Sequence, residues 1–183
     1  MAYMIVPKVI RDFTGKAPLT ELRHLPEVVA YFRNNLLVRS MQDGDCLVWT
    51  GRKNEKGYGK FRVRTKNRQI DFKAHRISWE LNFGEIIPGM EVCHKCDNRA
   101  CIKPDHLFLG DHYDNMYDCM KKGRHVWVKL QEPQVLEIRN SDLSISHLRK
   151  KYNLAHSTIA NIRKGRTWRK AGMESQTDGT FSK

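Results

Sequence analysis

One short stretch of the chain holds cysteines and a histidine at spacings that suit a metal ion. Cys96, Cys101 and His106 follow one another at equal intervals. Structural zinc is usually held by four Cys or His side chains in a closed tetrahedron, so these three residues require a fourth ligand from elsewhere. Cys46 is the preferred candidate and Cys93 the competitor, because Cys93 and Cys96 also have ligand spacing. The alternative is that these are buried, unpaired thiols of a reduced protein.

The same stretch contains a second histidine, His94, that the ligand spacing leaves out. The pattern His-x-Cys-x4-Cys-x4-His followed by Asp-Asn resembles the HNH nucleases, and among them the zinc-bearing His-Cys box homing endonucleases, over roughly residues 44–120. The resemblance implies that His94 is the general base and that Asn115 binds a catalytic Mg²⁺. The structural zinc site that it implies consists of Cys46, Cys96, Cys101 and His106.

The chemistry of these residues agrees with the implied roles. A histidine titrates near neutral pH and can take a proton from water. Mg²⁺ held through one side-chain oxygen and several waters can bridge the scissile phosphate. The resemblance also implies an arginine near that phosphate, for which Arg62 is the first candidate and Arg64 the second. The sequence departs from many HNH proteins at Cys93, where an aspartate often precedes the base, so Asn115 is the one ligand of the catalytic metal that the resemblance implies.

The composition predicts a polyanionic partner. The chain of 183 residues has 33 Lys and Arg against 20 Asp and Glu, a formal net charge of +13, and the basic residues are spread along it. No apolar run approaches the ~18 residues that span a bilayer, and residues 1–8 lack the apolar core of a secretory peptide. We therefore expect an intracellular, cytoplasmic protein with reduced cysteines and no membrane partner.

The periodicity of apolar residues predicts the elements that precede the stretch of candidate metal ligands. Apolar residues at helical spacing indicate a helix over 26–41. Strands are expected at 46–50, 58–65 and 69–73, forming one small antiparallel sheet. The face of this sheet that carries basic residues is expected to contact DNA. Its predicted contacts are Lys60, Arg62, Arg64, Arg68 and Lys73.

Further elements are expected to position His94 and Asn115. A helix begins at Ala74 and ends near Gly84, and a turn at 87–90 leads into the strand that delivers His94. A short strand at 107–109 is followed by a helix to about residue 122 that carries Asn115 in its first turns. His75, at the start of the first of these helices, is interpreted as a structural or phosphate-contacting residue and not as a catalytic one.

The C-terminal part predicts three helices that resemble the helix-turn-helix modules appended to phage and intron HNH nucleases. Ser144 is expected to cap the second helix, whereas Ala155 stands where a capping Ser or Thr would be expected before the third. The first residues of such a recognition helix reach base edges, and basic residues nearby suit phosphates. The candidates for base readout are His156, Ser157, Thr158 and Asn161, and those for phosphate contacts are Arg163, Lys164, Arg166 and Arg169.

These features predict an α+β protein. Its parts are a zinc-braced ββα-metal (HNH, or His-Me finger) nuclease core with a small antiparallel sheet and a C-terminal all-α helix-turn-helix module. The expected divisions are a lead-in and helix (1–43), the nuclease domain (44–125), the helix-turn-helix module (126–172) and a disordered tail (173–183).

The predicted function is a metal-dependent endonuclease of homing type, encoded by a phage or an intron. It would cut double-stranded DNA at a recognised site, as a monomer or a homodimer. The alternative is a zinc-stabilised, non-catalytic DNA-binding regulator, which would need the zinc ligands but would have no use for His94 and Asn115. An RNA-binding module is disfavoured, because no aromatic pair lies on the basic strand face where bases could stack.

Overall fold

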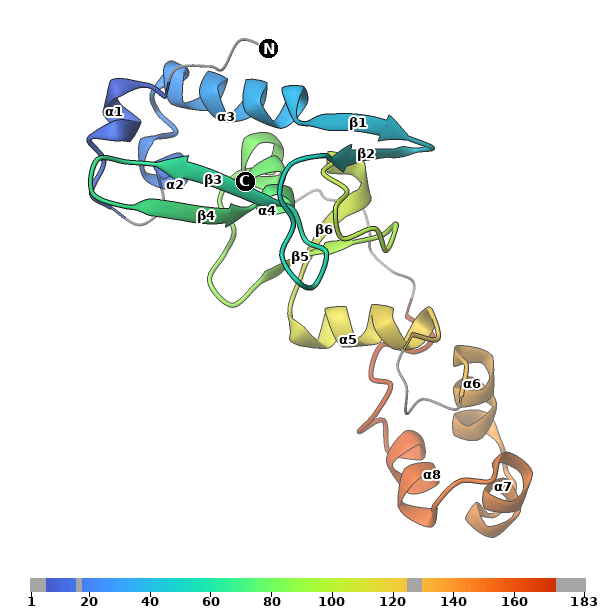
Figure 1. The fold of residues 1–183 in the computed structure, drawn as a ribbon. Helices are drawn as coiled ribbons and strands as arrows, with labels where there is room; N and C mark the ends of the chain where they lie inside the picture. The colour runs from blue at the N-terminus through green and yellow to red at the C-terminus, as the bar shows by residue number, and fades with distance from the viewer. Residues whose placement is uncertain (1–5, 16–17, 125–129, 174–183) are drawn as a thin grey trace. The chain divides into compact units, whose positions relative to one another are not determined.

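The computed structural model describes residues 6–15, 18–124 and 130–173 (Figure 1). The α-helices in these ranges are α1 (Lys8–Arg11), α2 (Pro18–Leu22), α3 (Pro26–Val38), α4 (Ala74–Phe83), α5 (His112–Lys121), α6 (Glu132–Asn140), α7 (Ile145–Tyr152) and α8 (His156–Arg163). The strands are β1 (Ser40–Asp43), β2 (Cys46–Trp49), β3 (Lys60–Arg64), β4 (Gln69–Lys73), β5 (Glu91–His94) and β6 (Leu107–Gly110). A 3₁₀ helix, η1 (Pro104–His106), precedes β6.

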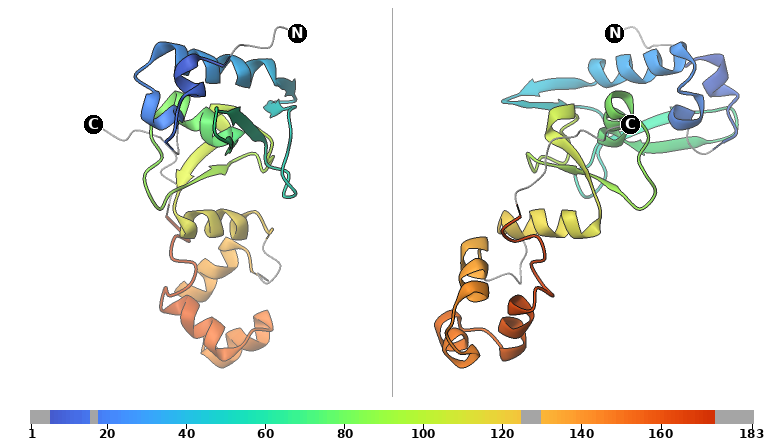
Figure 2. Two further views of the ribbon diagram at one scale, coloured as in Figure 1. Left: turned by 60° about the vertical axis from the view of Figure 1, so that its left-hand side comes forward. Right: turned by 180° about the vertical axis from the view of Figure 1, so that it is seen from behind.

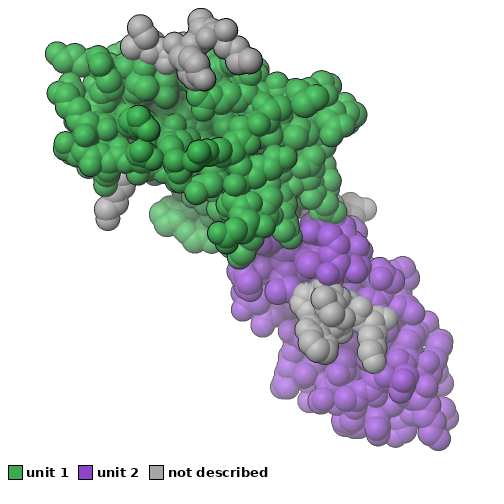
Figure 3. Space-filling model, in the orientation of Figure 1, with its two compact units in different colours: residues 1–111 green, residues 112–183 purple. Residues whose placement is uncertain are grey.

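The chain divides into two compact units, residues 1–111 and 112–183 (Figure 3). This division falls before α5, whereas the sequence predicted a boundary at residue 125. The difference has a packing cause, because Tyr117 and Met120 of α5 pack against the core of the C-terminal helices. A mixed α+β architecture with small antiparallel sheets, as predicted, is consistent with an HNH domain.

The core of the first unit is formed by α3, the β3–β4 hairpin and α4, which lie together in Figures 1 and 2. Val28, Phe32 and Leu36 of α3 recur at four-residue spacing and are buried on one helix face. The Phe61 ring of β3 packs against Phe32 at 5.3 Å and against Trp49 at 5.7 Å between ring centroids. Burial of such aromatic groups supplies much of the stability of a small core.

The strands pair as three separate two-stranded sheets rather than as the single sheet predicted. β2 pairs with β1 instead of β3, and the Gly44 backbone between them has φ +55°, which suits a tight hairpin turn. Ser40 and Met41 of β1 were expected to belong to the preceding helix, but α3 ends at Val38. β3 and β4 pair as predicted, with Arg62 opposite Asp71.

β5 and β6 are an antiparallel pair in which His94 lies opposite Leu107. The chain between them contains Cys96, Cys101 and His106, so all three return close to the strand end that carries His94. α4 braces this connection, because the buried Ser78 hydroxyl donates a hydrogen bond of 2.5 Å to the Ile102 carbonyl. The strand at 107–109 and the helix from Ala74 are thus confirmed.

The N-terminal lead-in is more ordered than the sequence predicted. The sequence specified no element before residue 26, but α1 and α2 lie there, and Ile10 and Leu19 are buried in the first core. Residues 125–129 and nearly all of the tail predicted as disordered lie outside the described residues. Among those that are described, no helix is long and apolar enough to cross a membrane.

The second unit contains α5 to α8 around a core of its own. The predicted cap is confirmed at Ser144, whose hydroxyl accepts a hydrogen bond of 3.3 Å from the His147 backbone N–H. Asn153 ends α7 in the left-handed conformation, and α8 begins after Ala155, which makes no side-chain capping bond. The buried apolar residues of this second core are Leu130, Val135, Ile138, Leu148, Ile159, Ile162, Trp168 and Ala171.

Candidate metal centre and active site

Cys46, Cys96, Cys101 and His106 converge in the first unit. Their ligand atoms all lie within 4.8 Å of one another. Cys46 comes from the first residue of β2, Cys96 and Cys101 from the connection after β5, and His106 from the end of η1. Cys93 is not among them; its sulfur lies 3.9 Å from the Glu91 carbonyl oxygen. The structure therefore places Cys46, and not Cys93, in the cluster.

The spacing of these atoms fits a tetrahedral zinc ion. Zn–S and Zn–N bonds of about 2.3 and 2.0–2.1 Å at the tetrahedral angle would place sulfur and nitrogen about 3.6 Å apart. The His106 Nδ1 atom lies 3.5 Å from the Cys46 sulfur and 3.6 Å from the Cys101 sulfur. Burial raises the pKa of the Cys101 thiol to about 12, so a bound metal would have to displace its proton. The cluster is compatible with zinc binding.

A carboxylate outside the ligand set orients the histidine. The Nε2 atom of His106 lies 2.9 Å from a carboxylate oxygen of Asp45, and Lys103 also pairs with Asp45. The hydrogen bond from Lys103, followed by that from His106, lowers the pKa of Asp45. A carboxylate on the far nitrogen of a metal-binding imidazole fixes its tautomer and directs Nδ1 to the metal. Asp45 therefore fits the role of an orienting partner.

Backbone pairing with β2 holds the metal-binding loop in place. The Trp49 N–H donates to the Ala100 carbonyl at 2.8 Å, and the Ile102 N–H donates to the Leu47 carbonyl at 2.7 Å. Between them, Val48 and Cys101 form an isolated antiparallel bridge. Because Cys46 begins the same strand, this pairing brings the distant fourth ligand to the loop.

His94 ends β5 and is tied to the same loop. The side chain is buried, and its Nε2 atom lies 3.0 Å from the Cys101 carbonyl oxygen. A carbonyl only accepts, so Nε2 carries the proton in this bond and Nδ1 is the basic nitrogen of the neutral ring. Cys101 thus contributes its sulfur to the metal cluster and its carbonyl to the orientation of His94.

Two aromatic side chains surround His94. The ring centroid of His75 lies 4.7 Å from that of His94, and Tyr58 lies 5.3 Å from His75 and 6.1 Å from His94. His75 is 2% exposed, and its Nδ1 atom has no hydrogen-bond partner within the described residues. Burial, followed by the nearby charge of His94, lowers the pKa of His75 to about 3. His75 is therefore neutral near pH 7.

The cations predicted to bind DNA differ in their partners. Arg62 makes a bidentate pair with Asp71, at 2.7 and 3.0 Å, and Lys60 pairs with the same carboxylate at 2.9 Å. Arg68 donates to the Thr14 and Gly15 carbonyls. Arg64, on the same face, is exposed. The basic face of the hairpin is thus partly neutralised by Asp71.

Lys73, another of the predicted DNA contacts, and Arg99 lie beside the aromatic group around His94. The Lys73 Nζ atom lies 5.2 Å from the Tyr58 ring centroid, and the Arg99 guanidinium carbon lies 5.6 Å from it. Arg99 also donates to the Lys56 carbonyl at 2.9 Å. Neither forms an ion pair with a carboxylate in the described parts of the chain. Both side chains are exposed, so they can accept an anionic partner.

The second unit contains the remaining candidates. Asn115 lies in the first turns of α5, as predicted, and its side chain is exposed. Among the candidates of the C-terminal module, Arg163 donates to the carbonyls of Ile138, Ser141 and Leu143. These hydrogen bonds fasten α8 to α6 and to the segment that follows it. The exposed candidates are His156, Ser157, Thr158, Lys164, Arg166 and Arg169, and Asn161 is half-buried.

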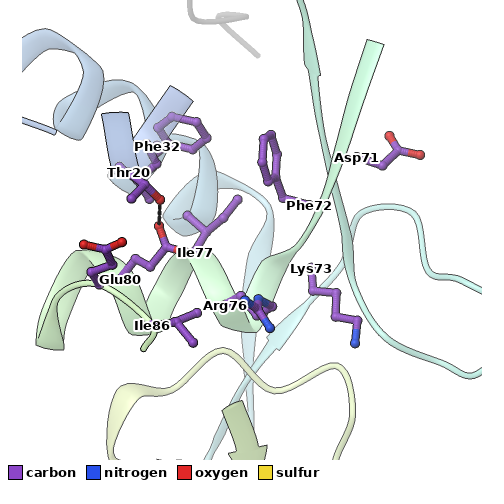
Figure 4. Close-up of a pocket in the computed structure, with 11 residues that line it drawn as sticks. Thr20, Phe32, Asp71, Phe72, Lys73, Arg76, Ile77, Glu80 and Ile86 are labelled. Carbon is purple, nitrogen blue, oxygen red and sulfur yellow. Dashed lines mark hydrogen bonds between the residues drawn. The ribbon is translucent and has the colours of Figure 1, made fainter. Parts of the chain in front are cut away.

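A pocket of about 500 Å³ lies on another part of the first unit (Figure 4). Its apolar side chains include Phe32, Phe72 and Ile77, and its wall carries a hydrogen bond of 3.0 Å from the Thr20 hydroxyl to Glu80. Of the predicted site residues, only Lys73 lines it. The pocket is therefore separate from the metal cluster and from His94.

Sequence reasoning missed three residues of this site: Asp45, Tyr58 and Arg99. Asp45 had a signal, since it immediately precedes a predicted ligand. Arg99 also had one, because it is a cation within the metal-binding loop. Tyr58 had none, because only the folding of the loop before β3 brings its ring near His94.

Comparison with known proteins places these residues in a family. Residues 72–117 match the HNH endonuclease family, a range that includes His94, Asn115 and three of the four cluster residues. The chain is 40% identical to Protein 7.7 of Escherichia phage T7 over 130 residues, 68% of this chain and 97% of that protein. It is 35% identical to Protein 2.8 of the same phage over 136 residues, 73% and 93% of the two chains. No solved structure matches.

We predict that Cys101→Ser lowers the zinc content and unfolds the first unit, because structural zinc contributes on the order of 10 kcal/mol to such sites. The measurements are metal analysis of the purified protein and circular dichroism. Cys93→Ser, in the same unit but outside the cluster, should retain zinc. A folded, zinc-free Cys101→Ser protein would show that the cluster does not brace the loop.

The low pKa of His75 predicts a pH-dependent stability. The unfolded chain takes up a proton at His75 below pH 6.5, whereas the folded chain does so only near pH 3. Stability is therefore lost as the pH falls from 6.5, by about 2 kcal/mol at pH 5. Urea unfolding of the wild type and His75→Gln at pH 7.5 and 5 measures this, and His75→Gln should lose about 2 kcal/mol less. Equal losses would mean that His75 ionises normally in the fold.

Proposed function

The chain belongs to the HNH endonuclease family, and from this membership we propose that it is a divalent-metal-dependent endonuclease that hydrolyses phosphodiester bonds of double-stranded DNA at a recognised site. The observation that carries the proposal is the hydrogen bond from His94 Nε2 to the Cys101 carbonyl. It leaves Nδ1 as the nitrogen that takes a proton from the attacking water. The zinc cluster has a structural role, because its four protein ligands complete a closed site.

In this proposal Asn115 holds the catalytic metal through its side-chain oxygen. Mg²⁺ bound there would stabilise the negative charge that develops on the scissile phosphate. Cys93, where an aspartate often stands, offers a thiol, which is a poor ligand for this hard cation. A metal held mainly by Asn115, water and substrate is expected to bind weakly without DNA.

The DNA contacts in the proposal come from both units. In the first unit they are cations of the β3–β4 hairpin. Among these, Arg62 is proposed to act near the scissile phosphate, although it also pairs with Asp71. In the second, α7 and α8 are proposed to form a helix-turn-helix whose exposed residues at the start of α8 read bases. We propose a homing-type or free-standing nuclease, and the similarity to phage proteins fits a phage protein that acts inside the host cell.

We expect His94→Ala to abolish cutting while DNA affinity stays near that of the wild type, because His94 moves a proton and does not supply a charge for binding. The measurement is conversion of supercoiled plasmid with Mg²⁺, with and without EDTA, beside filter binding. Asn115→Ala should also be inactive, and His24→Ala, an exposed histidine outside the site, should cut normally. Wild-type binding without cutting in any divalent metal would support a zinc-stabilised regulator instead.

The partners of the cations predict which of them bind phosphates most strongly. Changing Lys73 and Arg99 together to Gln should lower the slope of log affinity against log salt by about 2, since each phosphate contact contributes about 0.9. Changing Lys60 and Arg62 together should have a smaller effect, because both share Asp71. Titrations of a duplex at several salt concentrations measure both slopes. A larger decrease of the slope in the Lys60 and Arg62 variant would mean that these two cations, and not Lys73 and Arg99, make the main phosphate contacts.

A further inference from the structure

The helix that carries Asn115 is built into the C-terminal unit. α5 has ten residues, none of them fully buried. Isolated helices of this length are marginal in water, so α5 depends on packing against other elements. That packing comes from the second core, against which Tyr117 and Met120 lie.

Tyr117 connects α5 to three points of the C-terminal unit. Its ring meets that of Trp168 edge to face, with centroids 6.3 Å apart. Its hydroxyl donates to Glu132 at 2.7 Å and lies 3.3 Å from the Lys170 carbonyl oxygen. Glu132, at the start of α6, also accepts a hydrogen bond of 2.8 Å from the Gly172 N–H. One side chain of α5 thus joins the beginning of α6 to the segment that follows α8.

An ion pair fastens the first turn of the same helix. Asp114, the residue before Asn115, pairs with Lys170. At the other end of α5, Lys121 lies 4.0 Å from Glu132. Contacts at both ends and in the middle therefore fix the position of α5 relative to α6 and to the segment after α8.

We propose that the C-terminal helices hold the helix of Asn115 for catalysis, so that Tyr117 and Lys170 are positioning residues for cleavage. This inference rests on the proposed function and adds to it. From the sequence, the C-terminal module is predicted to serve site recognition only. In the structure the same module also supports the element that carries the proposed metal ligand.

Tyr117→Phe tests this in the full chain, because it removes the hydroxyl contacts but keeps the ring against Trp168. Hydrogen exchange of the α5 amides should be about tenfold faster, because the variant loses a partly buried hydrogen bond to a charged group. On duplex DNA, kcat should fall by about ten- to a hundredfold with KM little changed, since small misplacements of catalytic groups cost that much. Tyr113→Phe, on the same helix but 63% exposed, is the matched control and should change neither.

A second pair of variants isolates the ion pair. Lys170→Gln should lower kcat and raise the Mg²⁺ concentration needed for half-maximal rate, and Lys170→Arg should restore both. Lys151→Gln breaks an ion pair between α7 and Glu137 of α6 in the same unit and should do neither.

Wild-type kcat in Tyr117→Phe and Lys170→Gln would overturn the inference, whether or not exchange of α5 is faster. Unchanged exchange in Tyr117→Phe would also overturn it, and this readout does not depend on cleavage. Failure of the proposed function is recognised separately, as a wild-type protein that does not cut DNA in the same assay.

Discussion

The hydrogen bond between the His94 ring and the Cys101 carbonyl is the constraint on which the proposed chemistry depends. Cys101 also supplies a sulfur to the Cys3His cluster, so the geometry of the cluster and the orientation of His94 are set by one residue. A loop this short and polar has no core of its own. A bound metal and the backbone pairing with β2 would together provide the rigidity that a general base needs.

Many of the basic side chains of this protein bind groups of the protein itself. Arg139 donates to the carbonyls of Ile162, Thr167, Trp168 and Ala171, and so closes the second unit around its core. Arg163 and Arg68 also bind backbone carbonyls, and Arg62 binds a carboxylate. The net charge therefore overstates the surface available to DNA. Lys73 and Arg99 stand apart because they lie beside the aromatic group around His94 without a carboxylate partner in the described chain.

The aromatic surroundings of His94 and the attachment of α5 follow one principle at different scales. His75 and Tyr58 limit where the His94 ring can lie, and Tyr117 and Lys170 limit where α5 can lie. In each case a polar group with a proposed catalytic role lies on an element that is too small to hold its own position. Packing from neighbouring residues supplies that rigidity, and those neighbours need not touch the substrate.

The sequence alone indicated the candidate metal ligands, the family resemblance and most elements, because metal ligands must have particular types and spacings and because apolar periodicity is local. It identified Cys96, Cys101, His106 and His94 without knowledge of the fold. Only the tertiary structure showed that Cys46, and not Cys93, lies in the cluster, since that outcome depends on the pairing of β2 with a loop about fifty residues away. It also separated β1–β2 from β3–β4, paired Arg62 with Asp71 and assigned α5 to the C-terminal unit. These outcomes depend on contacts between distant segments, which no local pattern specifies.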